Sequence, residues 1–167
     1  GEPGAGKTIL SVQFLVKGVL EYGEKGIFVC LEEARPHLYR EMAKFGWELD
    51  RLEKENKLAF LDATPLRLLP NKIKVGDLSI DRKDFSISSL TQALQREVER
   101  LKPTRIVVDS ITSLTLQYHD IVQRRNALLD MVGTLVSTEA TCLMTNDLRS
   151  IGLRRRVGME EFLAHGV

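Results

Sequence analysis

The stretch that most constrains the fold is the first eight residues, which read Gly-Glu-Pro-Gly-Ala-Gly-Lys-Thr. They match the Walker A or P-loop pattern, G-x-x-x-x-G-K-[ST], which connects a buried strand to a helix. Glycines in such a loop let backbone N–H groups turn inward and surround phosphate oxygens. The pattern therefore predicts a phosphate-binding loop made of Gly1, Glu2, Pro3, Gly4, Ala5, Gly6, Lys7 and Thr8.

Two side chains of this loop have more specific expected roles. Lys7 is predicted to contact the β- and γ-phosphates of a nucleotide and to stabilise charge during transfer, and Thr8 to offer its hydroxyl to Mg²⁺. Apolar residues at helical spacing predict a helix over residues 7–22, whose positive N-terminal end would point at the same phosphates. A strand normally delivers this loop, yet the chain begins at the loop itself and without Met. We therefore expect the sequence to be an internal piece of a longer protein.

The composition narrows the class of protein. A chain of 167 residues, 43% hydrophobic and 28% charged, is long enough for a globular domain with a real core, and we expect residues 1–167 to form a single domain. Lys and Arg number 24 against 23 Asp and Glu, so any nucleic-acid binding must come from a local patch. Cys30 and Cys142 lie in apolar runs and are expected to be buried free thiols, which favours a reducing, cytoplasmic location. No stretch approaches the length of a membrane span, so no membrane partner is expected.

Short apolar runs alternate with helical patterns along the chain, which predicts an α/β fold with a mostly parallel central sheet. The expected strands are residues 26–31, 58–61, 105–110 and 140–144, and the expected helices are residues 7–22, 36–45, 49–55, 88–101 and 120–137. Residues 63–84 show no firm periodicity and hold either a small hairpin (72–75 with 78–80) or an irregular excursion. In the last helix, the residues expected to face inward are Val122, Leu128 or Leu129, Val132 and Val136.

Acidic and polar residues follow three of the predicted strands. Glu32 and Glu33 come directly after the first, where open α/β sheets bind ligands. One of them could orient or deprotonate a water that attacks a γ-phosphate; alternatively, both are acids at the start of the next helix. Asp109 ends the apolar run RIVVD in a Walker B pattern and is expected to hold Mg²⁺. Residues 145–147 end the last strand, where a γ-phosphate sensor could lie.

A basic segment follows at residues 148–156 and contains Arg154, Arg155 and Arg156. A loop of this kind could contact nucleic acid, a nucleotide held by a partner subunit, or only water. The histidines are scattered without metal-ligand spacing, so we expect them to be surface or structural residues.

Taken in order, the motifs GEPGAGKT, FVCLEE, FGWELDRL, RIVVDSITSL, TCLMTND and VGMEEF resemble the KaiC-like branch of the RecA superfamily of ATPases. The resemblance runs almost from end to end, and FVCLEE with FGWELDRL is its most specific part. It implies a three-layer, RecA-like P-loop domain that binds ATP and Mg²⁺. The family domain also has a strand before the loop and further strands after VGMEEF, and both are missing from this sequence.

The resemblance also implies functional residues and partners. The catalytic carboxylate of the family maps to Glu32 and Glu33, and the polar end of the later strand maps to residues 145–147, with Asn146 and Asp147 as nucleotide contacts. Hydrolysis would drive assembly or a conformational change in a homo-oligomer, a hexamer or a filament. Basic residues facing its central channel would contact nucleic acid or a protein partner, namely Arg124, Arg125, Arg154, Arg155 and Arg156.

Three other functions stay open at the level of the sequence. One is an ATP-gated regulatory scaffold with little turnover, and another is a DNA-binding, recombinase-like ATPase. The third is a small-molecule or nucleotide kinase, against which the acid pair after one strand and the Walker B Asp on a later strand both argue. A GTPase is disfavoured because the chain has no N-K-x-D motif for reading guanine.

Overall fold

The computed structural model describes residues 2, 4–64, 72–75, 78–81, 87–115, 118 and 120–147. Several predicted features lie outside these residues: Gly1, Pro3 and the three arginines at 154–156. Among the helices of the described part, none combines the length and the apolar character needed to cross a membrane.

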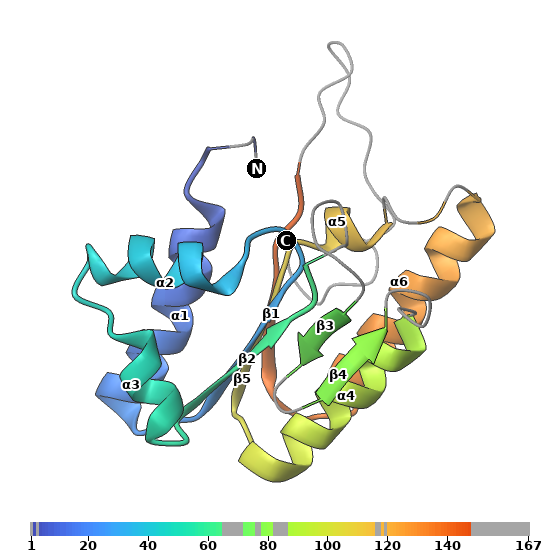
Figure 1. Cartoon of the computed structure of the whole chain (residues 1–167). Helices are drawn as coiled ribbons and strands as arrows, with labels where there is room; N and C mark the ends of the chain where they lie inside the picture. The colour runs from blue at the N-terminus through green and yellow to red at the C-terminus, as the bar shows by residue number, and fades with distance from the viewer. Residues whose placement is uncertain are drawn as a thin grey trace.

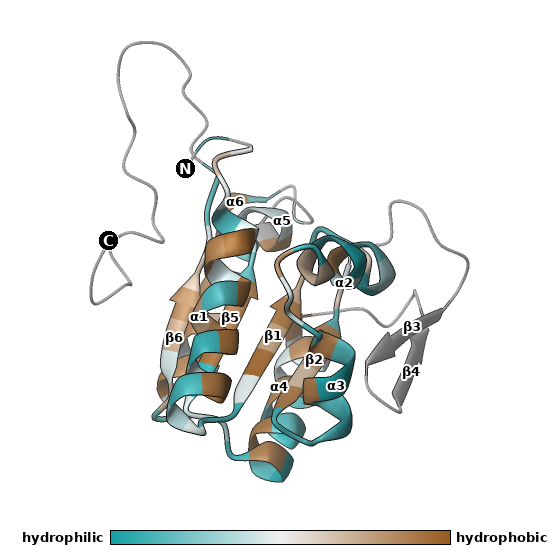
Figure 2. Ribbon diagram, turned by 90° about the vertical axis from the view of Figure 1, so that its left-hand side faces the viewer, coloured by the Kyte–Doolittle hydropathy of each residue, from teal (hydrophilic) through white to brown (hydrophobic). Residues whose placement is uncertain are grey.

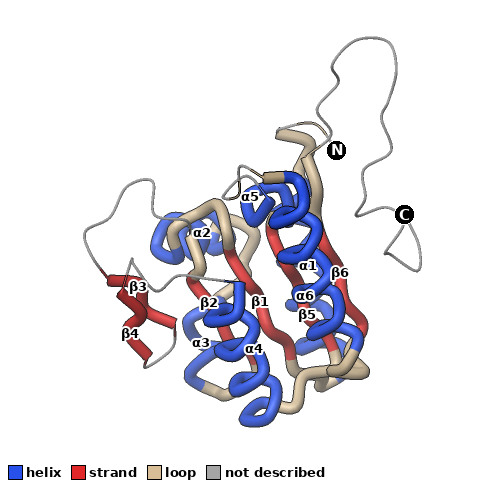
Figure 3. Tube along the Cα trace, turned by 90° about the vertical axis from the view of Figure 1, so that its right-hand side faces the viewer, coloured by secondary structure: helices blue, strands red, loops and turns tan. Residues whose placement is uncertain are grey.

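A sheet of four parallel strands lies at the centre of the described structure (Figure 3). In the order in which they lie side by side, the strands are β2 (Leu58–Asp62), β1 (Gly26–Cys30), β5 (Arg105–Asp109) and β6 (Thr141–Met144). Cys30 is level with Asp62 and Asp109, and Val108 is level with Met144. The strands therefore end together, so the segments that follow them meet at one edge of the sheet.

Helices cover both faces of this sheet and make three layers (Figure 1). One face is covered by α1 (Lys7–Tyr22), α2 (Arg35–Ala43) and α3 (Leu49–Lys54), and the other by α4 (Ile87–Leu101), α5 (Ile111–Thr115) and α6 (Ile121–Val136). The N-terminus of α1 and the whole of α5 lie at the edge where the strands end. The prediction of a three-layer α/β fold with a parallel sheet is confirmed.

The two central strands, β1 and β5, supply side chains to the hydrophobic core on both faces of the sheet. In β1, Ile27 and Val29 pack with α4 and α6, whereas Phe28 and Cys30 pack with α1 and α2. All five residues of β1 are buried, which explains the continuous apolar run in the sequence. Figure 2 shows the result, with hydrophobic strands behind helix α1, which alternates hydrophobic and hydrophilic stripes.

A small hairpin lies beyond β2, outside the main sheet (Figure 3). Its strands β3 (Lys72–Val75) and β4 (Leu78–Asp81) are antiparallel, with Val75 paired to Leu78 and Lys72 to Asp81. Of the two structures expected for residues 63–84, the hairpin is therefore the correct one.

Helix α6 exposes part of the face that the sequence predicted to be buried. Its buried residues are Ala127, Leu128, Met131 and Leu135. Val122 and Val136 are 59% and 60% exposed, so their predicted inward orientation is wrong. The helix carries two apolar stripes, and periodicity alone does not say which one packs on the sheet.

Candidate active site

The phosphate-binding loop has the backbone conformation that its glycines were expected to allow. Gly4 and Gly6 both adopt φ of +80°, a left-handed conformation that other residues rarely take. Gly6 is also the N-cap of α1, and no side chain caps this end of the helix. The positive N-terminal end of α1 therefore lies at the loop, where it favours an anion.

Lys7 connects this loop to the far side of the site. Its Nζ donates to the backbone oxygen of Glu2 at 2.9 Å and lies 2.7 Å from Asp147 Oδ1. Both charged groups of the Lys7–Asp147 pair are largely buried, with side-chain exposures of 18% and 24%. The lysine is thus held where the loop and the segment after β6 meet.

Asp109 lies at the centre of the site, at the end of β5, with only 3% of its surface exposed. Thr8 Oγ1 donates to its Oδ2 at 2.7 Å, and the hydroxyl of Thr145 donates to its Oδ1. Burial raises the pKa of Asp109, although these two hydrogen bonds oppose the shift. A carboxylate beside a threonine hydroxyl is a donor set that suits Mg²⁺ when phosphate oxygens and waters complete the coordination.

The described residues contain no group of three or more His, Cys, Asp and Glu side chains arranged to hold a metal ion. Any Mg²⁺ at this site would therefore depend on Thr8 and Asp109 together with oxygens of the nucleotide. This is the usual manner in which Mg²⁺ is held at nucleotide-binding sites, so the residues present fit the ion.

Glu32 and Glu33 point to different surroundings. Glu32 Oε1 accepts hydrogen bonds from the hydroxyls of Ser110 and Ser113, the latter at 2.8 Å. Its negative charge is near enough to contribute to the raised pKa of Asp109. Glu33 instead pairs with His37 in α2, on the other side of the loop that follows β1. Only Glu32 belongs to the group of side chains around Asp109.

The backbone of Glu33 is held as well as its side chain. Its carbonyl oxygen accepts from Cys30 Sγ at 3.0 Å, and Thr64 Oγ1, whose proton is donated to Asp62 Oδ1, lies 3.3 Å away. These contacts hold the turn after β1 against the end of β2.

Helix α5 supports the segment after β6. Thr112 Oγ1 donates to Asn146 Oδ1 at 2.6 Å and accepts from the Asp147 N–H at 2.8 Å. The Ile111 N–H donates to the carbonyl oxygen of Thr145 at 2.9 Å. The predicted sensor residues therefore lie beside the P-loop lysine, on a backbone that α5 holds in place.

Three hydroxyl residues of this site were not anticipated from the sequence, namely Ser110, Thr112 and Ser113. The sequence does contain a signal for them, because all three follow Asp109 within four residues, at the end of the strand that leads to the site. Of the predicted partner contacts, Arg124 and Arg125 are exposed near the start of α6, and Arg124 Nε donates to the carbonyl oxygen of Tyr118.

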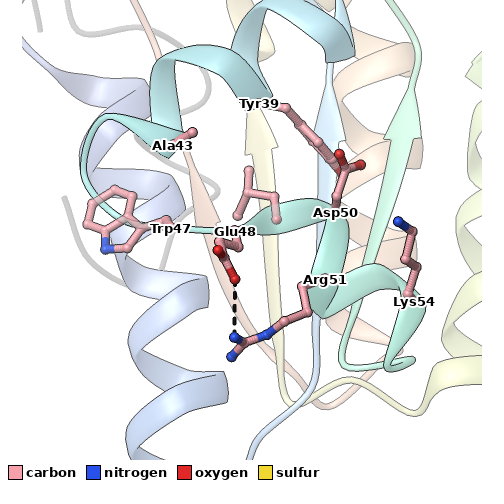
Figure 4. A pocket seen from close by; sticks show the side chains of 8 residues that line it. Tyr39, Ala43, Trp47, Glu48, Asp50, Arg51 and Lys54 are labelled. Carbon is pink, nitrogen blue, oxygen red and sulfur yellow. Dashed lines mark hydrogen bonds and ion pairs between the residues drawn. The ribbon is translucent and has the colours of Figure 1, made fainter.

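A hollow of about 400 Å³ between α2 and α3 lies apart from this group (Figure 4). Its lining includes Tyr39 and Trp47, and its rim carries a Glu48–Arg51 ion pair of 3.1 Å. Trp47 stacks on Phe45, with ring centroids 5.2 Å apart, and packs against the core. The FGWELDRL motif thus builds the packing of α2 and α3, while Lys7, Glu32 and Asp109 lie at the edge of the sheet.

Comparison with known proteins agrees with this arrangement. A family model described as "ATPase: KaiC" matches residues 1–167. The circadian clock oscillator protein KaiC of Synechococcus elongatus is 33% identical, with 100% of this chain and 31% of that protein covered. The circadian clock protein KaiC3 of a Synechocystis strain is also 33% identical, with 100% and 32% covered. The chain spans about a third of the length of these relatives.

A solved structure is similar to the chain as well. The crystal structure of a KaiC-like protein from the archaeon Pyrococcus horikoshii OT3 matches with a TM-score of 0.81 and 35% sequence identity. The match covers 98% of this chain and 66% of that one. The predicted resemblance in fold is therefore confirmed over nearly all of the sequence.

Proposed function

This chain belongs to the KaiC family of ATPases, and from that premise we propose that it binds Mg-ATP at residues 1–8 and hydrolyses it. The observation that carries the proposal is the 2.7 Å hydrogen bond from Thr8 Oγ1 to Asp109 Oδ2. It joins the phosphate-binding loop to the end of β5, at the edge of the sheet where Glu32 also lies. A lone P-loop would support nucleotide binding, whereas this grouping also supplies groups for hydrolysis.

In this proposal, the loop amides and Lys7 bind the β- and γ-phosphates. The γ-phosphate takes the place of the Asp147 carboxylate as the partner of Lys7, which the 2.7 Å distance between the two side chains supports. Asn146 lies next to Asp147 and offers its amide to the same phosphate.

Glu32 is the proposed water-orienting carboxylate, and Glu33 is the second candidate. Water attacks the γ-phosphorus, the bond to the β-phosphate bridging oxygen breaks with its electron pair leaving on ADP, and the proton of the water passes to Glu32. The contacts of Glu32 with residues beside Asp109 favour it over Glu33, which faces His37. Thr8 and Asp109 would hold Mg²⁺, which supplies charge neutralisation at the phosphates when bound.

We further propose that the protein assembles into a homo-oligomer, a hexamer or a filament, whose conformation responds to ATP. The exposed apolar side chains of α6 support a contact between copies, because Val122, Leu129 and Val136 lie on one stripe of this helix. Arg124 and Arg125 are exposed near the start of the same helix and are proposed contacts for nucleic acid or a protein partner. The predicted contacts at Arg154, Arg155 and Arg156 lie outside the described residues.

Steady-state ATP hydrolysis by the full-length protein tests the function, with Lys7→Ala and a Glu32→Gln/Glu33→Gln double variant alongside. If the wild type hydrolyses ATP and both variants lose this turnover, the result supports ATP hydrolysis as the function. Binding of ATP without turnover, unchanged in the double variant, would replace the proposal by an ATP-gated scaffold. The same assay with single-stranded DNA over a series of salt concentrations tests the recombinase alternative.

A further inference from the structure

One carboxylate oxygen of Glu32 is held by two separate hydroxyl groups. Oε1 accepts from Ser110 Oγ and, at 2.8 Å, from Ser113 Oγ. A carboxylate oxygen has two lone-pair sites, so these two donors occupy Oε1. Because the carboxylate is planar, holding Oε1 narrows the range of positions that Oε2 can take.

We propose that Ser113 is a positioning residue for hydrolysis, which fixes Oε1 of Glu32 so that Oε2 is the oxygen presented to the attacking water. This inference rests on the proposed function, since it requires Glu32 to be the water-orienting carboxylate. Without such a contact the side chain of a glutamate samples several rotamers, and only some of them place a carboxylate oxygen at the water. Small errors in placement of a catalytic group lower a rate strongly.

The support beneath Ser113 is rigid enough for this role. Ser113 lies in α5, directly before Leu114 and two residues after Ile111. These two side chains are buried in the core, with exposures of 0% and 1%. The Ser113 N–H donates to the carbonyl oxygen of Ser110 at 3.2 Å, and the Ile111 N–H donates to Thr145. The hydroxyl is therefore carried on a short side chain attached to a backbone that is fixed to the sheet.

Ser113 is a more informative target than Ser110. Ser110 is fully buried and follows Asp109 directly, so replacing it would disturb the core and the proposed Mg²⁺ ligand together. Ser113 is only partly buried, and its hydroxyl donates to Glu32. Its hydroxyl can be removed with little expected change in packing.

Steady-state ATP hydrolysis by the full-length protein tests the proposal with Ser113→Ala, Ser113→Thr and Glu32→Gln, singly and combined. Ser113→Ala is expected to lower kcat about tenfold with KM for ATP unchanged, since a hydrogen bond to a charged group is lost. Ser113→Thr keeps the hydroxyl, so its kcat should stay close to that of the wild type. In the Glu32→Gln background, Ser113→Ala should change the residual rate less than about twofold, because the group to be positioned is already gone.

Ser137→Ala is the matched control, since this hydroxyl at the end of α6 donates to Thr134 and has no contact with Glu32. Melting temperatures of all variants should agree closely. Wild-type kcat in Ser113→Ala, with Glu32→Gln inactive, would overturn the positioning role while leaving the proposed function intact. The same fold loss of kcat from Ser113→Ala in the wild-type and in the Glu32→Gln backgrounds would also overturn it. Full activity in Glu32→Gln would instead refute the proposed assignment of Glu32, and the inference with it.

Discussion

Lys7 Nζ lies 2.7 Å from Asp147 Oδ1, so the lysine of the phosphate-binding loop is paired with a carboxylate from the segment after β6. The two residues come from opposite ends of the described sequence, and neither motif alone implies the contact. In the proposed function, a γ-phosphate would take the place of this carboxylate, whose negative charge would repel it. We therefore expect nucleotide binding to require that the pair break.

The first prediction follows from that competition. Asp147→Asn keeps the shape of the side chain but removes its charge, so ATP should bind about three- to tenfold more tightly. Titration calorimetry with Mg-ATP measures the change. Asp130→Asn, an equal charge change on the exposed side of α6, is the control and should leave the affinity unchanged. Weaker binding by Asp147→Asn would show that the carboxylate contributes to nucleotide binding.

A second prediction concerns the contact between α5 and the segment after β6. Thr112→Val preserves the volume of the side chain but removes its hydrogen bonds with Asn146 Oδ1 and the Asp147 N–H. We expect the free energy of unfolding to fall by about 1–2 kcal/mol. Urea denaturation measures this value. The control is Thr91→Val, whose hydroxyl only donates to a carbonyl in the exposed first turn of α4; losses of equal size in both variants would contradict the special role of Thr112.

The third prediction is a dependence of stability on alkaline pH through Cys30. Burial raises the pKa of this thiol from 9.0 to about 12. Between these values the folded protein keeps the proton while the unfolded chain releases it, so the free energy of unfolding falls as pH rises. The slope from this group approaches about 1.4 kcal/mol per pH unit. Urea denaturation between roughly pH 9 and 10.5 should show a shallower decline in Cys30→Ala. If the free energy of unfolding fell equally with pH in the wild type and in Cys30→Ala, the raised pKa of Cys30 would not be the cause.

The fourth prediction concerns the start of α6. Asp120 is the N-cap of this helix, and its Oδ2 accepts from the Gln123 N–H at 2.9 Å. Asp120→Ala should lower the free energy of unfolding by about 1 kcal/mol, whereas Asp120→Asn should cost only a few tenths. Thermal denaturation compares the two. An equal loss from both substitutions would indicate that the charge, and not the cap, stabilises the helix.

Much of the fold could be predicted because local signals agree with the tertiary structure. Helix α1 was predicted at both of its ends, since the P-loop places the start at Lys7 and Gly23 ends the helix in a left-handed conformation with φ of 66°. The strands were recognisable because both of their faces are buried, which leaves an uninterrupted apolar run.

Other features depend on which of two similar residues or faces turns inward, and that choice is made by packing. Val122 and Val136 have the spacing of core residues, yet the stripe with Leu128 and Leu135 packs on the sheet. Glu32 and Glu33 are chemically alike and adjacent, and only the hydroxyls after Asp109 and the position of His37 separate them. The sequence could name the pair but not the member that belongs to the site.

The most direct test of the account is therefore ATP turnover by the single variants Glu32→Gln and Glu33→Gln in the full-length protein. Each replaces a carboxylate by an amide of the same shape, so the two serve as matched controls for one another. We predict that Glu32→Gln lowers kcat by at least about 100-fold and that Glu33→Gln stays within about threefold of the wild type. An equal loss in both variants, or a larger loss in Glu33→Gln, would contradict the assignment of Glu32 as the carboxylate that orients the water.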